Sequence, residues 1–261
     1  IGGTVRAADL AGGIAGVKEG DDSRQGLITG LTCSCEVTAV KGNAGGIAGK
    51  NQGIIENCVY GGTETAKTAA PEAAGGIAGI NDNGGIIRAC ETGLSDISGR
   101  GTAQKPAAIG GIAGNNMAGA MIVNSLPGVN GTASVHTTEK TYGNAGGIAG
   151  TNSGTITETG YVRKSGREGQ AVSHDSMDYS LIDSSITEVS CYLGHAGGIA
   201  GYNRKTGDIT EAVTGRDWTV NVSGIAKEYG CGGICGYSAS ESGLRNCINR
   251  ADVTKAGNGV S

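Results

Sequence analysis

A five-residue motif, Gly-Gly-Ile-x-Gly, occurs seven times in the chain, and this repetition constrains the fold more than any other feature of the sequence. Successive copies begin 33, 30, 35, 36, 51 and 35 residues apart. Repeats of this length are typical of solenoids, in which each repeat packs only against its neighbours. The copies occupy residues 12–16, 45–49, 75–79, 110–114, 146–150, 197–201 and 232–236.

The third position of the motif predicts a core column, because it is Ile in every copy. Stacked strands place equivalent residues of successive repeats above one another, so these side chains would form one continuous apolar column. The fourth position is Ala six times and Cys once, which indicates that a neighbouring segment lies close to it. The column consists of Ile14, Ile47, Ile77, Ile112, Ile148, Ile199 and Ile234.

An Asn follows the motif by two residues in five copies, and Ser238 takes its place in the last. Asn tolerates left-handed turn conformations, and Asn side chains on stacked strands can hydrogen-bond to one another. We therefore expect an Asn ladder at a corner of the coil, with neighbours such as Thr151 exposed to solvent. The ladder would contain Asn51, Asn81, Asn116, Asn152 and Asn203.

A second apolar column follows the Asn column. In later copies a small residue, such as Cys58, follows this column by three positions. The first copy fits the second column less well, and we expect Thr32 to be its member of the column and Cys35 its small residue. A more variable third leg, such as residues 133–137, alternates apolar and polar side chains as a strand does. Three short strands per coil are therefore predicted. The second column is Ile55, Ile87, Ile122, Ile156, Ile209 and Leu244.

The fold class that these columns predict is all-β, a right-handed parallel β-solenoid of about seven coils. The chain has 51 Gly, only three Pro and no Phe, so one large aromatic core is excluded and thin aliphatic layers are favoured. Gly-Gly-Ile-x-Gly also disfavours helix, which argues against helical repeats of similar length. We interpret residues 1–261 as one solenoid domain belonging to a longer protein.

The two ends of the chain carry parts of further coils. Residues 1–10 resemble the third leg of a preceding coil, and residues 249–261 stop where an eighth motif would begin. A finished solenoid protects its open ends with polar caps, so we expect further repeats, caps or end-to-end association.

The motif also predicts an apolar strip. Alternation along one strand would place Gly45, Ile47 and Gly49 on one side, and Ala44, Gly46 and Ala48 on the other. If Ile faces inward, a smooth strip of Ala and Gly faces outward, and we expect it to be packed against another segment, a neighbouring module or a second copy.

Residues 44–62, read as Ala-Gly-Gly-Ile-Ala-Gly-Lys-Asn-Gln-Gly-Ile-Ile-Glu-Asn-Cys-Val-Tyr-Gly-Gly, resemble the GLUG-type repeat of bacterial surface proteins. The family has Leu-Val where this chain has Ile-Ala. The resemblance extends over about residues 11–250 and implies a structural segment of adhesin-like proteins or immunoglobulin A peptidases. It implies an extracellular, cell-surface or wall-attached location and leaves the ligand open.

The eight Cys residues have competing interpretations. Cys58, Cys90 and Cys247 stand in a small-residue column and Cys235 replaces Ala in the motif, which favours a role as small core residues. Disulfides are the alternative expected of a secreted protein. No Cys-x-x-Cys pairs recur at zinc-site spacing, so we expect no metal and no cofactor.

The fifth repeat is longer than the others by some 15 residues, and the excess lies within residues 161–190. This insert holds the candidate binding residues His174, Asp175, Asp178, Tyr179 and Asp183, which could ligate a metal or act as acid and base. A solvated loop commonly has the same composition, and this is the interpretation that we favour for the insert.

These features predict a non-catalytic structural stalk or an adhesion module. Its expected partners are a host protein, a glycan or neighbouring modules of the same protein. Self-association through the open ends or the Ala/Gly strip is a further expected contact. The alternative is a carbohydrate-active β-helix lyase or hydrolase with its site near the insert. Catalytic β-helices group several charged residues on one sheet face, whereas charges are scattered here and no hydrolase or phosphate-loop motif occurs. Mixed charges with a net of −4 disfavour nucleic acid, and no apolar stretch could span a membrane.

Overall fold

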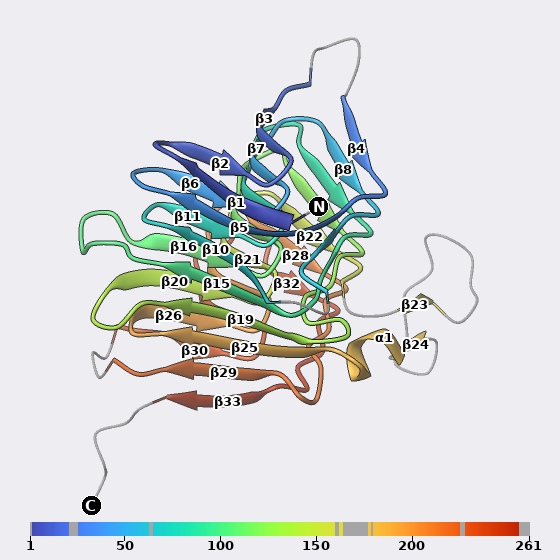
Figure 1. The fold of residues 1–261 in the computed structure, drawn as a ribbon. Helices are drawn as coiled ribbons and strands as arrows, with labels where there is room; N and C mark the ends of the chain where they lie inside the picture. Colours follow the sequence, from blue (N-terminus) through green and yellow to red (C-terminus); the bar gives the residue numbers. More distant parts are fainter. Residues whose placement is uncertain are drawn as a thin grey trace, which may run out of the picture.

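The computed structural model describes residues 2–20, 26–62, 65–159, 162–163, 177–178, 180–224 and 228–255. These residues form an all-β parallel solenoid of about seven coils, in which each coil lies directly on the one before it in sequence (Figure 1). The predicted fold class is confirmed.

Four parallel sheets, called A to D here, run along the stack. Sheet A contains β1 (Gly2–Ala7), β5 (Thr32–Ala39), β10 (Ala66–Ala70), β15 (Ser95–Gly99), β19 (Thr132–Thr137), β25 (Ile186–Cys191), β29 (Thr219–Val222) and β33 (Asp252–Lys255). The short strands β9 (Val59–Tyr60) and β14 (Glu91–Thr92) extend it beside β5. Sheet B contains β2 (Leu10–Gly12), β6 (Asn43–Gly45), β11 (Ala73–Gly75), β16 (Ala107–Gly110), β20 (Tyr142–Gly146), β26 (Leu193–Gly197) and β30 (Cys231–Gly232).

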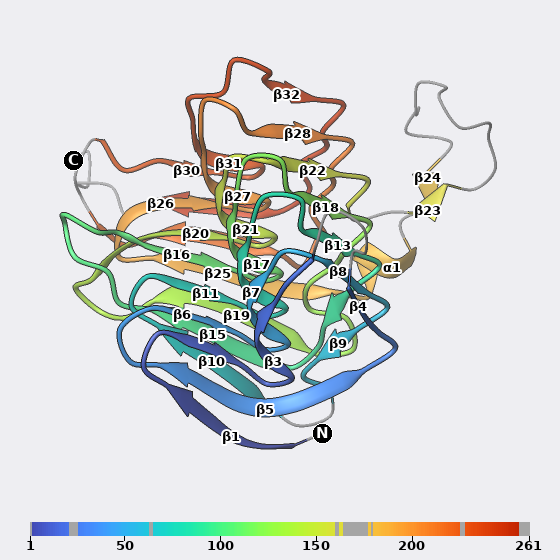
Figure 2. The same ribbon diagram turned by 90° about the horizontal axis from the view of Figure 1, so that it is seen from above.

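Sheets C and D complete each coil, and Figure 2 shows sheet C between sheets B and D. Sheet C contains β3 (Ala15–Lys18), β7 (Ala48–Asn51), β12 (Ala78–Asn81), β17 (Ala113–Asn116), β21 (Ala149–Asn152), β27 (Ala200–Asn203) and β31 (Cys235–Ser238). Sheet D contains β4 (Leu27–Thr29), β8 (Ile54–Glu56), β13 (Ile86–Arg88), β18 (Met121–Val123), β22 (Thr155–Thr157), β28 (Asp208–Thr210) and β32 (Leu244–Arg245).

The motif turns a corner instead of forming one strand, and this corrects the expectation of three strands per coil. In the second copy β6 ends at Gly45 and β7 begins at Ala48, so Gly46 and Ile47 form the turn between sheets B and C. A β-carbon on Gly45 would overlap the carbonyl oxygen of Ala48, and this tight turn therefore requires glycine. Each coil consequently contributes four main strands, one to each sheet.

The Ala/Gly strip is buried within the chain itself. Ala44 and Ala48 are fully buried, and a β-carbon on Gly79 in sheet C would contact the backbone of Ala44 in sheet B of the previous coil. Sheets B and C thus cover one another at the corner. The strip is packed in the inner coils, as expected, but the predicted alternation of its residues along one strand was wrong. In the inner coils the strip offers no surface for self-association, whereas Ala15 and Cys235 in the end coils are partly exposed.

The two predicted Ile columns lie in the core, together with inward side chains of sheet A such as Val135 and Val189. The five inner members of the motif column are fully buried, whereas Ile14 and Ile234 in the end coils are only partly buried against the core. In the second column Leu244 is 42% exposed at the end of sheet D. The first copy contributes Ile28, which pairs in register with Ile55, and not Thr32 as expected.

The Asn ladder is confirmed and lies buried inside the coil, at the corner that follows sheet C. Each side-chain amide donates from Nδ2 to Oδ1 of the Asn in the next coil, and the last rung donates to Ser238. The Nδ2 to Oδ1 distances are 2.9, 2.9, 2.8 and 2.9 Å from Asn51 to Asn203. Buried amides with both partners satisfied favour one register of the stack, because any slip would leave them unpaired.

Strands of sheet A lie at both ends of the described chain. Gly2–Ala7 pairs in parallel with β5, which is the place that the predicted third leg of a preceding coil would take. At the other end β33 pairs with β29.

The insert leaves the stack between sheets D and A, after β22, and returns at β25. Its described part comprises the antiparallel pair β23 (Val162–Arg163) and β24 (Met177–Asp178) and the short helix α1 (Ser180–Asp183). Trp218 is fully buried where the insert returns, and its indole Nε1–H donates to Ser185 Oγ at 3.0 Å. Within the described residues, no helix has the length and apolar character needed to cross a membrane.

Replacing Asn116 by Ala should lower the free energy of unfolding by about 2–4 kcal/mol, because it removes two rungs of the ladder and leaves buried amide groups of Asn81 and Asn152 with fewer partners. Urea unfolding followed by circular dichroism measures this change. Asn115→Ala is the matched control, since Asn115 points away from the ladder, and should change the stability by less than about 0.5 kcal/mol. Equal losses in the two variants would contradict a stabilising role for the ladder.

Candidate binding groove

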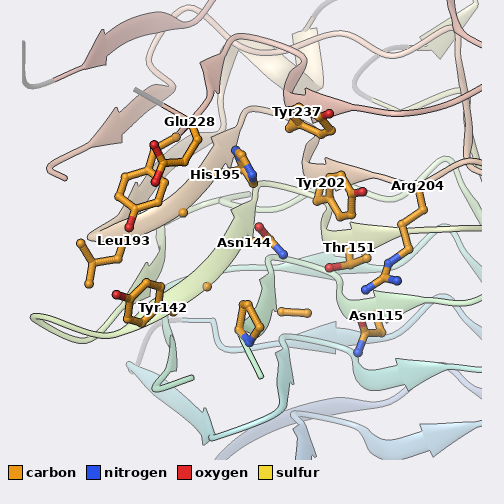
Figure 3. A pocket seen from close by; sticks show the side chains of 15 residues that line it. Asn115, Tyr142, Asn144, Thr151, Leu193, His195, Tyr202, Arg204, Glu228 and Tyr237 are labelled. Carbon is orange, nitrogen blue, oxygen red and sulfur yellow. The ribbon is translucent and has the colours of Figure 1, made fainter. Parts of the chain in front are cut away.

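A groove with a volume of about 460 Å³ lies on the outside of the corner between sheets B and C. The corner forms because the glycines of the motif let the two sheets approach closely. The outer faces of the sheets therefore meet at a concave angle along the stack, and side chains from both faces line the space between them (Figure 3).

Two columns of outward residues supply much of the lining. The residue two places before each of the first six motifs forms one column in sheet B, namely Leu10, Asn43, Ala73, Ala108, Asn144 and His195. The residue directly after each motif forms the other in sheet C, namely Val17, Lys50, Ile80, Asn115, Thr151, Tyr202 and Tyr237. The groove lies at the C-terminal members of both columns.

Three aromatic rings from the two sheets contact one another in the groove. The ring centroids of His195 and Tyr202 are 6.0 Å apart with an interplanar angle of 24°. The centroid of Tyr237 lies 5.1 Å from His195 and 5.3 Å from Tyr202. These distances are within the range of favourable aromatic contacts, so the rings support one another as a platform. Figure 3 shows this platform above Asn144.

The imidazole of His195 is held in its neutral form. Its Nδ1 accepts a hydrogen bond from the backbone N–H of Gly230 at 2.9 Å, so the proton of the neutral ring is on Nε2. Burial, and secondarily the positive charge of Lys255, lower the pKa of His195 below its ordinary value. Lys255 itself donates from Nζ to the carbonyl oxygen of Tyr229 at 2.6 Å.

The opposite wall is formed by the first residues of two strands of sheet B, Tyr142 of β20 and Leu193 of β26, and by Tyr229, which precedes β30. Burial, together with the neighbouring Tyr142 and Glu228, raises the pKa of the Tyr229 hydroxyl, so this phenol is neutral at physiological pH. Four of the eight Tyr residues of the chain therefore line one groove.

Polar groups at the base of the groove have unused hydrogen-bonding capacity. In the part of the chain that the structure describes, the side-chain amides of Asn115 and Asn144 have no protein partner. The hydroxyl of Thr151 lies beside them, and this residue is only 4% exposed, which corrects the expectation that it projects into solvent at a corner. An amide offers two donors and one acceptor oxygen, so these residues can bind a ligand rich in hydroxyl or carbonyl groups.

The insert residues proposed from the sequence do not belong to this groove. His174, Asp175 and Tyr179 lie outside the described residues, and for Asp178 the structure gives only its backbone position in β24. The carboxylate of Asp183 contacts Arg250, with 2.8 Å between Oδ1 and the guanidinium nitrogen. Figure 1 places α1, β23 and β24 on the side of the stack away from the strands of sheet B.

The eight cysteines carry free thiols in the structure, and five of them are buried. Cys58 and Cys90 occupy the predicted small-residue column on adjacent coils, next to paired strands. A hydrogen bond with the Cys90 thiol lowers the pKa of Cys58 to about 7, and the same contact and burial raise that of Cys90. Burial raises the pKa of Cys191 to about 12.

No group of three or more His, Cys, Asp or Glu side chains within the described residues is arranged to hold a metal ion. Among the described residues that line the groove, Glu228 is the one carboxylate and Arg204 the one permanent cation. The guanidinium carbon of Arg204 lies 5.5 Å from the ring centroid of Tyr202, so its charge already contacts an aromatic face.

The groove residues were missed at the sequence level because the repeat was read for what its copies share. The two outward columns differ from copy to copy, and only their C-terminal members are aromatic. Comparing the residue directly after each motif would have detected the change from Val17 and Lys50 to Tyr202 and Tyr237.

Comparison with known proteins does not assign the chain to a family. No protein-family model and no curated protein matches the sequence, so the resemblance to GLUG-type repeats stays an interpretation. Among solved structures, the chain is similar to a candidate immunoglobulin A1 protease from Bacteroides ovatus, with a TM-score of 0.44 and 18% sequence identity. The alignment covers 95% of this chain and 59% of that one, so the present chain spans only part of its length. A similarity at this level gives no information on activity.

His195 should titrate with a midpoint below 6.5, its ordinary pKa, in an NMR titration of its ring protons, because burial and Lys255 disfavour the imidazolium. Since the folded-state pKa is lowered, the stability that neutral His195 contributes is present above pH 6.5 and is lost as the pH falls towards the folded-state value. The variant Lys255→Gln should bring the midpoint closer to 6.5. A midpoint at or above 6.5 in the native chain would contradict the buried, neutral form of His195.

The native chain should expose at most three thiols to a bulky thiol reagent, those of the partly buried Cys231, Cys235 and Cys247, and eight after denaturation. Buried thiols react slowly because the reagent cannot reach them, and for Cys33, Cys90 and Cys191 burial also disfavours the thiolate. Counting the released chromophore measures both numbers. Fewer than eight reactive thiols in the denatured, unreduced chain would instead establish disulfides.

Proposed function

We propose that this chain is a non-catalytic binding module of a secreted or surface-attached bacterial protein, and that the groove between sheets B and C is its binding face. The observation that carries the proposal is the convergence of four Tyr side chains, His195 and two unpartnered amides in one concave site. Ligand sites in proteins are typically clefts of this size, apolar or aromatic in their walls and with a few placed polar groups.

The chemistry of the groove supports binding rather than catalysis. Glycoside hydrolysis typically uses a pair of carboxyl groups, and among its described lining residues the groove has a single one, that of Glu228. His195 has its Nδ1 engaged by the Gly230 backbone. The lining is therefore suited to contact a ligand through rings and hydrogen bonds.

The extracellular location is part of the same proposal. It rests on the resemblance of residues 44–62 to repeats of bacterial surface proteins and on the rigid stack, which can hold a binding face away from an attachment point. In this arrangement the solenoid serves as the stalk and the groove as the adhesive surface.

Beads coated with the purified chain should adhere to mucus-covered epithelial cells, and Tyr237→Arg should reduce adhesion several-fold, because a long charged side chain would fill the groove from sheet C. Tyr237 is 48% exposed, so the variant should remain folded, which buried Trp218 reports through its fluorescence. Lys67→Ala on the outer face of sheet A is the control and should adhere like the native chain.

Adhesion that is equal in the native chain and in Tyr237→Arg would contradict the assignment of the groove as the binding face. Incubation with polysaccharides tests the non-catalytic part. Release of new reducing ends or unsaturated sugar products by the native chain, lost in His174→Ala, would replace this proposal with the carbohydrate-active enzyme whose site is near the insert.

A further inference from the structure

The shape of the groove selects for a ligand that lies along the stack. Asn115, Thr151, Tyr202 and Tyr237 stand on four consecutive coils of one column, with strands separated by about 4.8 Å. From the first of these residues to the last, the lining therefore extends roughly 14 Å along the stack. This length, with the volume of about 460 Å³, accommodates a short chain of rings better than a compact ion.

The lining presents different chemistry at different levels of the stack. His195, Tyr202 and Tyr237 of the last two coils offer ring faces and edges. Asn115 and Asn144 of the two preceding coils offer amide donors and acceptors without protein partners. A bound ligand must therefore combine an apolar C–H face with a rim of hydroxyl or carbonyl groups. A pyranose ring has both, since its axial C–H bonds form an apolar face and its hydroxyls project at its edge.

The charges disfavour ionic ligands. Arg204 is already stacked over Tyr202, Glu228 has the opposite sign, and Lys255 is bonded to the Tyr229 carbonyl outside the lining. One cation does not make a site for a phosphate or sulfate group, which is usually held by several donors. A quaternary ammonium would compete with Arg204 for the Tyr202 face. His195 is neutral at physiological pH, so it adds no charge.

We infer that the groove binds a neutral oligosaccharide. One sugar ring stacks against the platform of His195, Tyr202 and Tyr237, and hydroxyls of the oligosaccharide hydrogen-bond to Asn144 and Asn115. This inference rests on the proposed function, since it names the class of ligand for the same groove. The Nε2–H of His195 and the phenol groups supply further donors at the edge of the platform.

Isothermal titration of the full chain with neutral probes, such as chitobiose, N-acetyllactosamine and mannobiose, tests the inference, with phosphocholine and a sulfated disaccharide as charged probes. At least one neutral probe should bind, and Tyr237→Ala should weaken it about tenfold, the equivalent of 1.4 kcal/mol expected for the loss of a ring contact. Tyr237→Phe should stay within about threefold, because it keeps the ring. Asn144→Ala should weaken binding about fivefold or more.

Val17→Ala is the matched control, because Val17 belongs to the same column as Tyr237 and is 41% exposed, but lies at the opposite end of the stack. It should leave the affinity unchanged. In the adhesion experiment, oxidation of the cell-surface glycans with periodate should abolish adhesion of the native chain.

Three results would overturn the inference. Binding of phosphocholine or of the sulfated probe alone would assign a charged ligand to the groove. Adhesion that depends on Tyr237 but survives periodate would support the proposed binding function of the groove, and would show that its ligand is a protein and not a saccharide. A neutral probe that binds Tyr237→Ala and Asn144→Ala as tightly as it binds the native chain would place the saccharide site elsewhere on the chain.

Discussion

The whole structure depends on a steric constraint at one corner, where sheets B and C approach more closely than strands with side chains allow. A β-carbon on the first glycine of the motif would overlap the carbonyl oxygen three residues later, as Gly45 and Ala48 illustrate. The last glycine lies against the backbone of the neighbouring sheet, as Gly79 does against Ala44. Glycine loses more conformational freedom on folding than other residues, so ordering each corner has an entropic cost. Interactions between the residues that meet at the corner must offset this cost.

On the inner side the corner brings together the Ile column and the Asn ladder. Ile148 and its equivalents fill the space that the turn opens towards the core, and the Asn side chains satisfy the backbone groups of the turn that follows sheet C. Asn51, for example, accepts from the backbone N–H of Gly53 at 3.1 Å while it donates to the next coil. The apolar column adds buried apolar surface, whereas the ladder fixes the register, because a shifted coil would leave amide groups unpaired in the core.

The inner side of the solenoid was therefore predictable from the sequence, and the outer side was not. Repeated residues such as Ile47 and Asn51 mark positions where every coil meets the same environment, so counting them gave the columns and the ladder. The division of the coil into four strands was missed, since Gly-Gly-Ile-x-Gly is equally compatible with a flat strand and with a corner until the backbone contact is known. The groove was missed because its residues, Tyr202 and Tyr237 among them, are separated from Tyr142 and Tyr229 in sequence and meet only where two sheets face each other.

The same corner explains how a repeat protein can confine binding to one part of a uniform stack. Core positions are constrained in every coil, because a change there disturbs the coils on both sides. The outward residue before or after a motif contacts mainly other outward residues, as Tyr202 contacts Tyr237 on the next coil. The column in sheet C can thus change from Val17 through Asn115 to Tyr237 without altering the strands that carry it. Sheets B and C run side by side along the stack, so an aromatic residue placed in one column can meet the residues of the other, as His195 of sheet B meets Tyr202 and Tyr237 of sheet C. The position of a site along the solenoid then depends on which coils carry large outward side chains. The geometry of the site depends on the motif glycines, which let sheets B and C approach each other at the corner.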